Sequence, residues 1–372
     1  MKFAIDLLWV RYGKIGGGVA VVLNLLSGLL LLQDEFEVYL IITKDNEQLF
    51  SKYTADKRFK LVLLDELSND RKRTVFLQNF ILANILEKNG IDICLEPDNY
   101  MPIFRKGNVK YVTVIHDLQA IHFPQNFSKM KMLWLKLNWW NAFKYSTRLI
   151  AISKFTKQDI IKNFGVDKNK ISVVYDPVVV DEHEVTEFEP IGKLLGIKEK
   201  DFYYTVSSMG RNKNLVTLLD MMAVLKKRNV CNKKLVISGI GKSKSSEQFL
   251  KIAKEKGIEE NIILTGFVDN ATRNALYKAC EVFLFPSIFE GFGMPPIEAK
   301  LFGTKVITTR ESSIPEVTQN VALYVDNPFD ANEWAERVLR TDEKDEGKID
   351  FTRYSIAVIA KQYLDVITKC LP

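Results

Sequence analysis

Two carboxylates flank a glycine-containing segment in the second half of the chain. Glu290 and Glu298 are separated by seven residues that include Gly291, Gly293 and a Pro-Pro pair. The apolar run at 281–285 has the composition of a strand, and the prolines predict the start of a helix with Glu298 in its first turn. The glycines permit positive φ and close backbone approach, and a helix start offers free N–H groups to an anion.

Carboxylates on either side of an anion site suit a ligand with hydroxyl groups on both sides of a phosphate. A nucleotide sugar is such a ligand. The alternative is that Glu298 only favours a helix N-terminus through its charge, while Glu290 is a solvated loop residue.

Two further turns could bind an anion. Gly17 and Gly18 lie between a predicted strand at 3–8 and an apolar helix at 19–32, and Gly239 follows a strand at 234–238. The first turn lacks the GxGxxG spacing, and no acidic residue ends a second strand, which disfavours a dinucleotide-dependent dehydrogenase. The alternative for Gly17 and Gly18 is a helix start without a ligand.

Polar residues also follow two other predicted strands. His116 comes directly after the strand at 111–115, where ligands of open α/β sheets bind. Arg211, Lys213 and Asn214 lie between a strand at 202–206 and a helix. The alternative for His116 is a side chain whose hydrogen bonds are satisfied by local backbone. The alternative for Arg211, Lys213 and Asn214 is a set of surface charges before a helix.

The order of predicted elements indicates an α/β protein with mostly parallel sheets, because strands alternate with helical stretches. A length of 372 residues favours two domains, and an acidic, poorly periodic stretch at 181–190 is typical of a linker. We expect a first domain at 1–178, a linker at 179–192 and a second domain at 193–353. The last helix is expected at about 354–372.

The segment from Glu290 to Glu298 resembles the E-x7-E signature of the retaining GT-B glycosyltransferases, in particular glycosyltransferase family 4. His116-Asp117, the Ser153 to Thr156 segment and the turn at 207–214 are similar to further motifs of that family. The likeness covers most of both halves. It implies the GT-B fold, two Rossmann-like doubly wound domains facing a deep interdomain cleft, with the last helix packing back on the first domain.

The resemblance also implies roles for individual residues. His116, Glu290 and Lys213 correspond to residues that act at the reacting sugar and the departing diphosphate. The residues that correspond to the donor-binding positions are Gly17, Gly18, Arg211, Asn214, Gly239, Phe267, Val268, Gly291, Phe292, Gly293 and Glu298.

The implied activity is transfer of a hexosyl or deoxyhexosyl group from a nucleotide sugar to a glycan or lipid-linked glycan, in bacterial surface polysaccharide or glycoconjugate assembly. The nucleotide sugar is a substrate, and neither a metal nor another cofactor is expected. The alternatives are a sugar-nucleotide epimerase of the same fold and a degenerate, non-catalytic nucleotide-sugar-binding protein. Departures from the family pattern at Ser207 and at 175–178 keep the second alternative open.

Composition adds limits on partners and location. A net charge of +6 is too modest for a dedicated nucleic-acid binder, but it favours anionic ligands or an anionic membrane surface. Four widely spaced cysteines predict a reducing cytoplasm, and no stretch predicts a transmembrane helix. The expected location is cytoplasmic, with peripheral association at the inner face of the plasma membrane if a suitable surface exists.

One candidate for such a surface is the segment 127–144, which has two apolar faces on a helical wheel. Trp139 and Phe143 lie on one face, and Leu137 and Trp140 lie on the other, with lysines between them. Either one face enters the core and the other meets a lipid interface, or both faces are buried within the domain.

Overall fold

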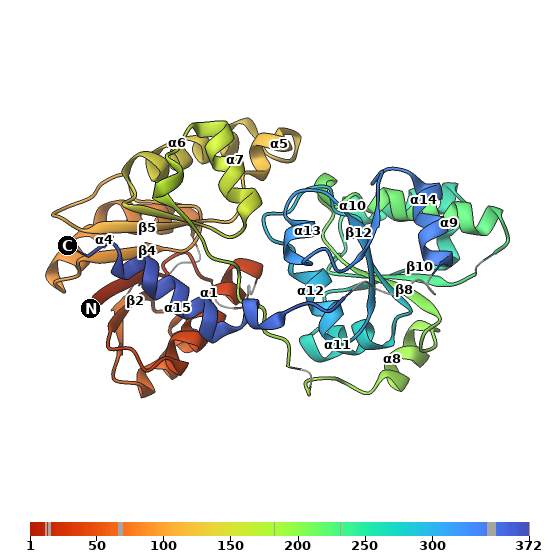
Figure 1. Ribbon diagram of the computed structural model, residues 1–372, viewed down its shortest axis with the longest axis horizontal. Helices are drawn as coiled ribbons and strands as arrows, with labels where there is room; N and C mark the ends of the chain where they lie inside the picture. Colours follow the sequence, from red (N-terminus) through yellow and green to blue (C-terminus); the bar gives the residue numbers. More distant parts are fainter. Residues whose placement is uncertain are drawn as a thin grey trace. The chain divides into compact units, whose positions relative to one another are not determined.

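The computed structural model describes residues 1–371 except 12, 14, 15, 66–69, 182, 231 and 341–346. The chain divides into two compact units (Figure 1). The first consists of Met1–Val179 with Phe351–Pro372, and the second of Val180–Asp350. Among the described residues, no helix is both long enough and apolar enough to cross a bilayer.

The first unit is built on a seven-stranded parallel sheet in the order β3-β2-β1-β4-β5-β6-β7. Ile5 at the centre pairs with Leu40 on one side and Leu95 on the other. The strand order reverses between β1 and β4, and ligands of doubly wound sheets bind beyond the carboxyl ends at such a point. The strands are β1 (Lys2–Asp6), β2 (Glu37–Thr43), β3 (Phe59–Leu64), β4 (Ile93–Glu96), β5 (Lys110–Ile115), β6 (Arg148–Ala151) and β7 (Ile171–Val173).

Helices cover this sheet and bury its apolar side chains. The last helix of the chain packs against the first, where Gly28 leaves no room for a side chain because a Cβ there would lie 2.2 Å from the Ile356 carbonyl oxygen. The helices of the unit are α1 (Gly17–Leu31), α2 (Glu47–Phe50), α3 (Arg71–Phe76), α4 (Leu82–Lys88), α5 (Gln119–His122), α6 (Lys129–Tyr145), α7 (Lys154–Phe164) and α15 (Ile356–Thr368). A π-helical turn at Leu77–Ile81 joins α3 to α4, and short 3₁₀ turns lie at Ser51–Ala55, Pro124–Asn126, Lys168–Lys170 and Phe351–Tyr354.

The second unit contains a six-stranded parallel sheet in the order β10-β9-β8-β11-β12-β13. Its strands are β8 (Phe202–Val206), β9 (Lys234–Ser238), β10 (Ile262–Gly266), β11 (Val282–Phe285), β12 (Lys305–Thr309) and β13 (Leu323–Val325). Its helices are α8 (Phe188–Leu195), α9 (Leu215–Lys227), α10 (Lys244–Glu255), α11 (Asn270–Ala279), α12 (Met294–Leu301), α13 (Ile314–Val317) and α14 (Ala331–Leu339), with 3₁₀ turns at Arg211–Lys213 and Glu259–Asn261.

Helix α8 begins inside the stretch 179–192, for which the acidic composition predicts a linker. Phe188 opens this helix, and its ring stacks on that of Phe202 at a centroid distance of 5.8 Å. Burial of this aromatic pair against the core of the second unit outweighs the polar character of the flanking sequence.

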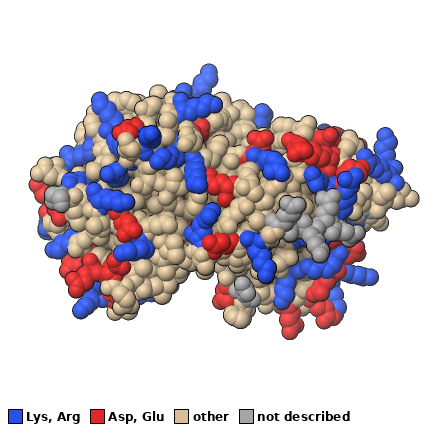
Figure 2. Space-filling view, in the orientation of Figure 1, with Lys and Arg blue, Asp and Glu red and all other residues tan. Residues whose placement is uncertain are grey.

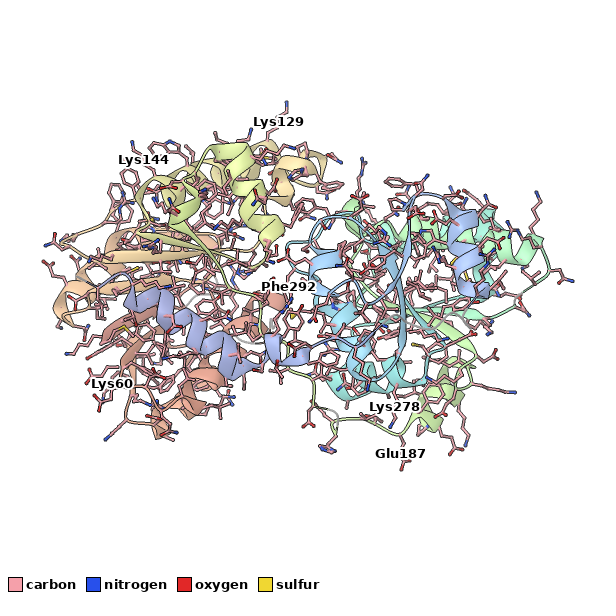
Figure 3. The ribbon with its side chains drawn as sticks, in the orientation of Figure 1. Lys60, Lys129, Lys144, Glu187, Lys278 and Phe292 are labelled. Carbon is pink, nitrogen blue, oxygen red and sulfur yellow. The ribbon has the colours of Figure 1, made fainter. Side chains whose placement is uncertain are left out.

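Helix α6 exposes one of its two apolar faces. Trp139 and Phe143 are buried, whereas Leu137 and Trp140 are both more than half exposed. Lys129 and Lys144, near the two ends of the helix, extend outward from the unit (Figure 3). The interpretation that both faces are buried is therefore wrong.

Candidate active site

The loop between β11 and α12 has the backbone that its glycines and prolines predict. Gly293 precedes the helix with φ of 95°, a value that L-residues rarely adopt, and the prolines lie in the first turn. Ahead of it, β11 is a fully buried strand. The predicted order of strand, glycine loop and helix is confirmed.

Glu290 and Lys213 form an ion pair in the second unit. The Lys213 ammonium lies 2.6 Å from one carboxylate oxygen of Glu290 and 2.9 Å from the other. Both side chains are mostly buried: 22% of the Lys213 side chain and 12% of the Glu290 side chain are exposed. Sequence reasoning placed both residues in one site but did not anticipate that they bind each other across 77 positions of sequence.

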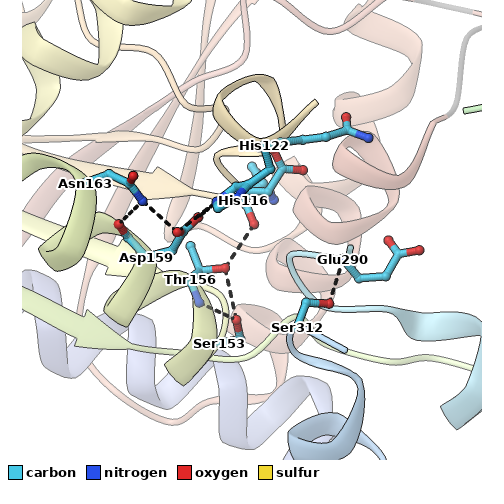
Figure 4. A network of polar contacts seen from close by, with 10 residues as sticks. His116, His122, Ser153, Thr156, Asp159, Asn163, Glu290 and Ser312 are labelled. Carbon is cyan, nitrogen blue, oxygen red and sulfur yellow. Dashed lines mark hydrogen bonds and ion pairs between the residues drawn. The ribbon is translucent and has the colours of Figure 1, made fainter. Parts of the chain in front are cut away.

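Two serines hold the backbone around Glu290. Its N–H donates to the Ser312 hydroxyl at 2.8 Å (Figure 4). The Ser313 hydroxyl lies within hydrogen-bond distance of the Glu290 and Phe292 carbonyls. Ser312 adopts φ of 51°, which turns the chain just before α13. The two serines before α13 thus hold the glutamate loop in place.

Asn212 ties the basic turn to the same loop. Its side-chain amide donates to the Phe289 carbonyl at 3.1 Å, and its own carbonyl accepts from the N–H of Ile288 at 2.8 Å. The residue is almost fully buried. Sequence reasoning missed it, although its place between two predicted site residues was a signal.

Glu298 lies deeper in α12 than expected. It is the fifth residue of a helix that begins at Met294, so its expected place in the first turn is wrong. The Tyr277 hydroxyl donates to it at 2.8 Å, and the Arg273 guanidinium is 3.8 Å away. Burial, followed by the Glu298 charge, raises the pKa of Tyr277 well above its usual value, which keeps this hydrogen-bond donor protonated.

Two residues of the basic turn differ in their surroundings: Asn214 is held by hydrogen bonds within the unit, whereas Arg211 is exposed. Asn214 starts α9 with φ of 49°, and its side chain donates to the Pro328 carbonyl at 2.8 Å and accepts from Thr217 at 2.8 Å. These contacts occupy the amide that was expected to bind the donor. Arg211 is exposed, and within the described part of the chain no acidic partner lies in ion-pair distance of it.

Gly239 and Phe267 lie on neighbouring turns of the second unit. A Cβ on Gly239 would approach the Ser207 carbonyl oxygen to 2.6 Å, and φ is 90°, so only glycine fits there. Phe267 leaves 82% of its side chain exposed and lies against Gly241, while Val268 is half-buried. A flat apolar ring at a strand end suits contact with a planar base.

Phe292 does not present its side chain to a ligand. Only 3% of it is exposed, and neighbouring Gly291 is buried as well. The Phe292 ring belongs to the core beneath the loop, so a contact of Phe292 with the donor would involve its backbone, and its place in the donor site stays a prediction.

In the first unit, His116 follows β5 with one ring nitrogen already engaged. Its Nε2 lies 2.7 Å from the Pro97 carbonyl oxygen, and its backbone N–H donates to Asn99 at 2.8 Å. Since a carbonyl only accepts, Nε2 carries the hydrogen, and Nδ1 is the remaining polar atom of the neutral ring. The alternative that local backbone satisfies the His116 side chain is therefore correct for one of its two ring nitrogens, Nε2.

Buried carboxylates surround this histidine. Burial lowers the pKa of His116, but the charges of Asp176 and then Asp98 outweigh that effect and raise it above its ordinary value. Asp176 is 4% exposed, and burial raises its pKa to about 6 against the attraction of His116. One oxygen of Asp176 has no hydrogen-bond partner within the described chain.

A short polar chain fixes the segment beside His116. Ser153 caps α7 by accepting from the Thr156 N–H at 3.0 Å, and the Thr156 hydroxyl is 3.4 Å from the His116 carbonyl oxygen (Figure 4). Ser153 therefore has a structural role as the N-cap of α7.

Gly17 and Gly18 form the first turn of α1, which Gly16 precedes without a side-chain cap. Gly17 is exposed, and a Cβ on Gly18 would lie 3.5 Å from the ring of Trp9. In the described parts of both units, no group of three or more potential metal ligands is present.

Comparison with protein families matches both units. Residues 15–182 match the model described as Glycosyltransferase Family 4, and residues 189–355 match Glycosyl transferases group 1. The chain belongs to these glycosyltransferases. Its two parallel sheets form the GT-B fold.

Several relatives of this glycosyltransferase carry names from surface glycan assembly. It is 25% identical to the O-antigen chain mannosyltransferase RfbU of Salmonella typhimurium over 68% of this chain and 66% of that protein. It is 32% identical to the N-acetylgalactosamine-N,N'-diacetylbacillosaminyl-diphospho-undecaprenol 4-alpha-N-acetylgalactosaminyltransferase of Campylobacter jejuni over 44% of this chain and 42% of that protein. Across these and other curated relatives, the chain spans between 22% and 66% of their length.

Solved structures agree on the fold. The Anabaena protein HepE in complex with UDP-glucose superposes with a TM-score of 0.71 over 99% of this glycosyltransferase and 100% of HepE, at 15% identity.

Proposed function

We propose that this chain transfers a sugar from a nucleotide-sugar donor to a glycan or lipid-linked glycan acceptor in the assembly of a bacterial surface polysaccharide. The observation that carries the proposal is the Glu290–Lys213 pair at 2.6 Å, in which Glu290 lies in the loop before α12 and Lys213 in the turn before α9. The names of the curated relatives support the process and the class of acceptor.

In this proposal the second unit holds the donor. Glu298, already oriented by Tyr277, accepts hydrogen bonds from the ribose hydroxyls, and Phe267 lies against the base. Gly239 lets the backbone approach the nucleotide. The backbone N–H groups at 291–293 and the start of α12 face the diphosphate, with Arg211 as an additional cation.

Glu290 and Lys213 act at the reacting end of the donor. Donor binding inserts the sugar and its phosphate beside the ion pair, so that Glu290 accepts from sugar hydroxyls and Lys213 donates to the phosphate oxygen that becomes the leaving group. The bond between the anomeric carbon and this oxygen breaks as negative charge develops on the diphosphate. A preorganised cation stabilises that charge most in the transition state.

We expect retention of the anomeric configuration by front-face displacement. The acceptor hydroxyl attacks from the side of the leaving group, its oxygen bonds to the anomeric carbon, and its proton passes to the departing phosphate. His116 would position the sugar through Nδ1 or through the backbone that it holds. No carboxylate is assigned as a nucleophile, so orientation and electrostatics supply the rate enhancement.

The acceptor proposal includes contact with a membrane. Helix α6 contacts the segment that contains Phe104, because the Asn141 amide donates to the Met101 carbonyl at 2.8 Å and the Arg105 guanidinium lies over the Tyr145 ring. Phe104 is exposed, and its ring is 4.9 Å from that of Phe80, which is 5.1 Å from that of Phe76. Residues 71–81, 101–106 and 129–145 contain lysines and arginines but no aspartate or glutamate. Figure 2 displays basic side chains along the edge of the first unit where α6 runs. An apolar surface rimmed by cations suits an anionic lipid interface.

The direct test is product formation. Purified protein is incubated with UDP-, GDP- and dTDP-sugars and with lipid-linked or free glycan acceptors, and products are detected by mass spectrometry. The proposal expects one donor to give a glycosylated acceptor whose new linkage has the donor's configuration by NMR. Release of a free epimer without need for an acceptor would favour the epimerase instead, which the names of the relatives do not support.

A further inference from the structure

The first unit contains a cavity of about 280 Å³ that the donor assignment leaves unused. It lies beyond the carboxyl ends of β1 and β4, where the strand order of the sheet reverses. The side chains that give the cavity its character are Trp9, Arg11, Arg71, Glu96, Tyr100 and Trp134. All of them come from this unit alone.

Buried hydrogen-bonding groups form one wall of the cavity. Glu96 is 1% exposed, and burial together with the nearby charge of Asp6 raises its pKa well above the usual value. Gln78, another lining residue, donates to Asp6 at 2.6 Å. Glu96 is hydrogen-bonded to Asp6, and the Cys94 thiol donates to it at 3.5 Å. Its proton is engaged by Asp6, so what Glu96 offers a ligand is a carboxyl oxygen that accepts a hydrogen bond from a hydroxyl.

Aromatic side chains form the opposite wall. The rings of Tyr100 and Trp134 are stacked with centroids 6.2 Å apart and an interplanar angle of 16°. The Arg71 guanidinium lies over Trp134 at 5.2 Å from the ring centre. Trp9 is fixed by a hydrogen bond from its indole N–H to the Asp6 carbonyl at 3.1 Å. Rigid rings beside polar groups match the alternating apolar and hydroxyl surfaces of a sugar.

Positive charge predominates in the cavity. Within the described residues, neither Arg11 nor Arg71 has a carboxylate within 4 Å, while Asp98 is the one lining carboxylate other than Glu96. The charge of Arg71 acts on Asp98, but so do those of His116 and Lys131. The two guanidinium groups are thus not neutralised, and Arg favours bidentate contact with carboxylates and phosphates.

The volume limits what can enter. Small-molecule sites span roughly 300–1,000 Å³, so a cavity of about 280 Å³ has the size of a site for one sugar ring. Its lining residues belong to the first unit, whereas the donor residues assigned above from Arg211 to Glu298 belong to the second.

We propose that this cavity binds the terminal sugar of the acceptor and that this sugar carries an anionic group, a carboxylate or a phosphate ester. This inference rests on the proposed function, because it names the acceptor of the same reaction. The guanidinium groups of Arg11 and Arg71 bind the anion, Glu96 accepts from a ring hydroxyl, and Trp134 packs against the apolar face of the ring.

The test uses the full-length protein without donor and measures ligand binding by NMR and by thermal shift. The probes are methyl glucuronide and glucose 6-phosphate, with methyl glucoside as the neutral analogue and inorganic phosphate as the free anion. We expect both charged sugars to bind at least tenfold more tightly than methyl glucoside and more tightly than phosphate. Arg71→Gln should reduce charged-sugar binding tenfold or more, Trp134→Leu should weaken binding of every sugar, and the adjacent exposed Lys72→Gln should change nothing.

Several outcomes would overturn the inference. Equal binding of charged and neutral sugars would remove the anionic requirement, and phosphate binding as tight as that of glucose 6-phosphate would reduce the site to a free anion site. Absence of any sugar binding, or normal binding by both Arg71→Gln and Arg11→Gln, would leave the cavity without this role. Nucleoside diphosphate binding measured on the same samples separates these failures from failure of the proposed function, since the donor residues lie in the second unit.

Discussion

At the scale of single residues, the candidate active site depends on charges that are paired before any ligand arrives. Lys213 neutralises Glu290, and Tyr277 with Arg273 holds Glu298. Burial of two charges carries a desolvation cost that their attraction and hydrogen bonds offset, and each pair sets the orientation that a donor would meet. Removal of one partner leaves the other mostly buried and unpaired, so it should lower stability.

Replacement of Glu290 by Gln should lower turnover by about 10²–10³-fold, in the range seen when a transition-state contact is lost, while nucleoside diphosphate affinity changes little. Lys213→Ala should weaken diphosphate binding, and Lys213→Arg should recover part of it because a cation is restored. Steady-state kinetics and calorimetry separate these effects, with exposed Lys251→Ala as the control. Wild-type kinetics in Lys213→Ala would place the phosphate elsewhere.

Glu298→Ala should weaken nucleotide binding, since the ribose contact is present in the ground state as well as in the transition state. Loss of the carboxylate also leaves the buried Tyr277 hydroxyl without its acceptor, at a cost of about 1–3 kcal/mol in stability. Tyr277→Phe is the matched variant, because it removes the hydrogen bond and keeps the carboxylate. If both variants lose stability but bind nucleotide as the wild type does, Glu298 is structural only.

Asp176 should make the first unit less stable as the pH rises. Its pKa is about 6 in the folded protein against 3.8 as a free group, so folding favours the protonated form. Stability from this group is fully present below about pH 3.8 and is lost as the pH rises through 6. His116, whose pKa is also raised, loses its contribution in the same direction at higher pH.

The variant Asp176→Asn should therefore gain melting temperature relative to the wild type as the pH goes from 4 to 7. Melting curves at matched ionic strength measure the difference. A variant that is destabilised equally at both pH values would contradict the assignment of the buried charge to Asp176.

At the scale of elements, α6 shows what a helical wheel can and cannot predict. The pattern of residues correctly gave two apolar faces, but Trp139 and Phe143 face the core only because the neighbouring strands and α7 cover them, and Phe164 of α7 packs edge-on to both rings. The sequence of α6 alone does not determine which of its two faces other elements cover. The exposed face is the one containing Leu137 and Trp140.

The double variant Leu137→Ser, Trp140→Ser should fold normally and lose binding to vesicles that contain anionic lipid. Each lysine near the surface contributes about 1 kcal/mol to attraction, so wild-type binding should fall with salt. Vesicle co-sedimentation with and without anionic lipid measures this. The control is Leu194→Ser, which changes an apolar residue of the second unit that is 83% exposed.

Wild-type protein that ignores anionic vesicles would contradict the membrane proposal. Trp139→Ser provides the opposite test at the same helix, because truncation of a buried tryptophan costs about 3–5 kcal/mol and should unfold the first unit.

At the scale of the whole molecule, the sequence predicted the alternation of strands and helices in both units and the glycine loop of the candidate site. It did not predict β12 and β13. Strand β12 pairs with β11 and β13, and β13 is a strand of three residues at the edge of the sheet. Sequence reasoning also missed the second-turn position of Glu298 and the ion pair between Lys213 and Glu290, because both depend on where the chain folds and not on residue type. Local patterns give elements, whereas contacts between distant segments complete the site.

The most direct measurement of the central claim is a thermal-shift titration with UDP-, GDP- and dTDP-sugars on the wild type and on Lys213→Ala and Glu298→Ala. A ligand that binds the folded state stabilises it by about 2.7 kcal/mol at a concentration 100-fold above its Kd. At least one nucleotide sugar should raise the melting temperature of the wild type, and both variants should lose most of this shift. No shift with any nucleotide sugar, or an equal shift in all three proteins, would contradict the central claim.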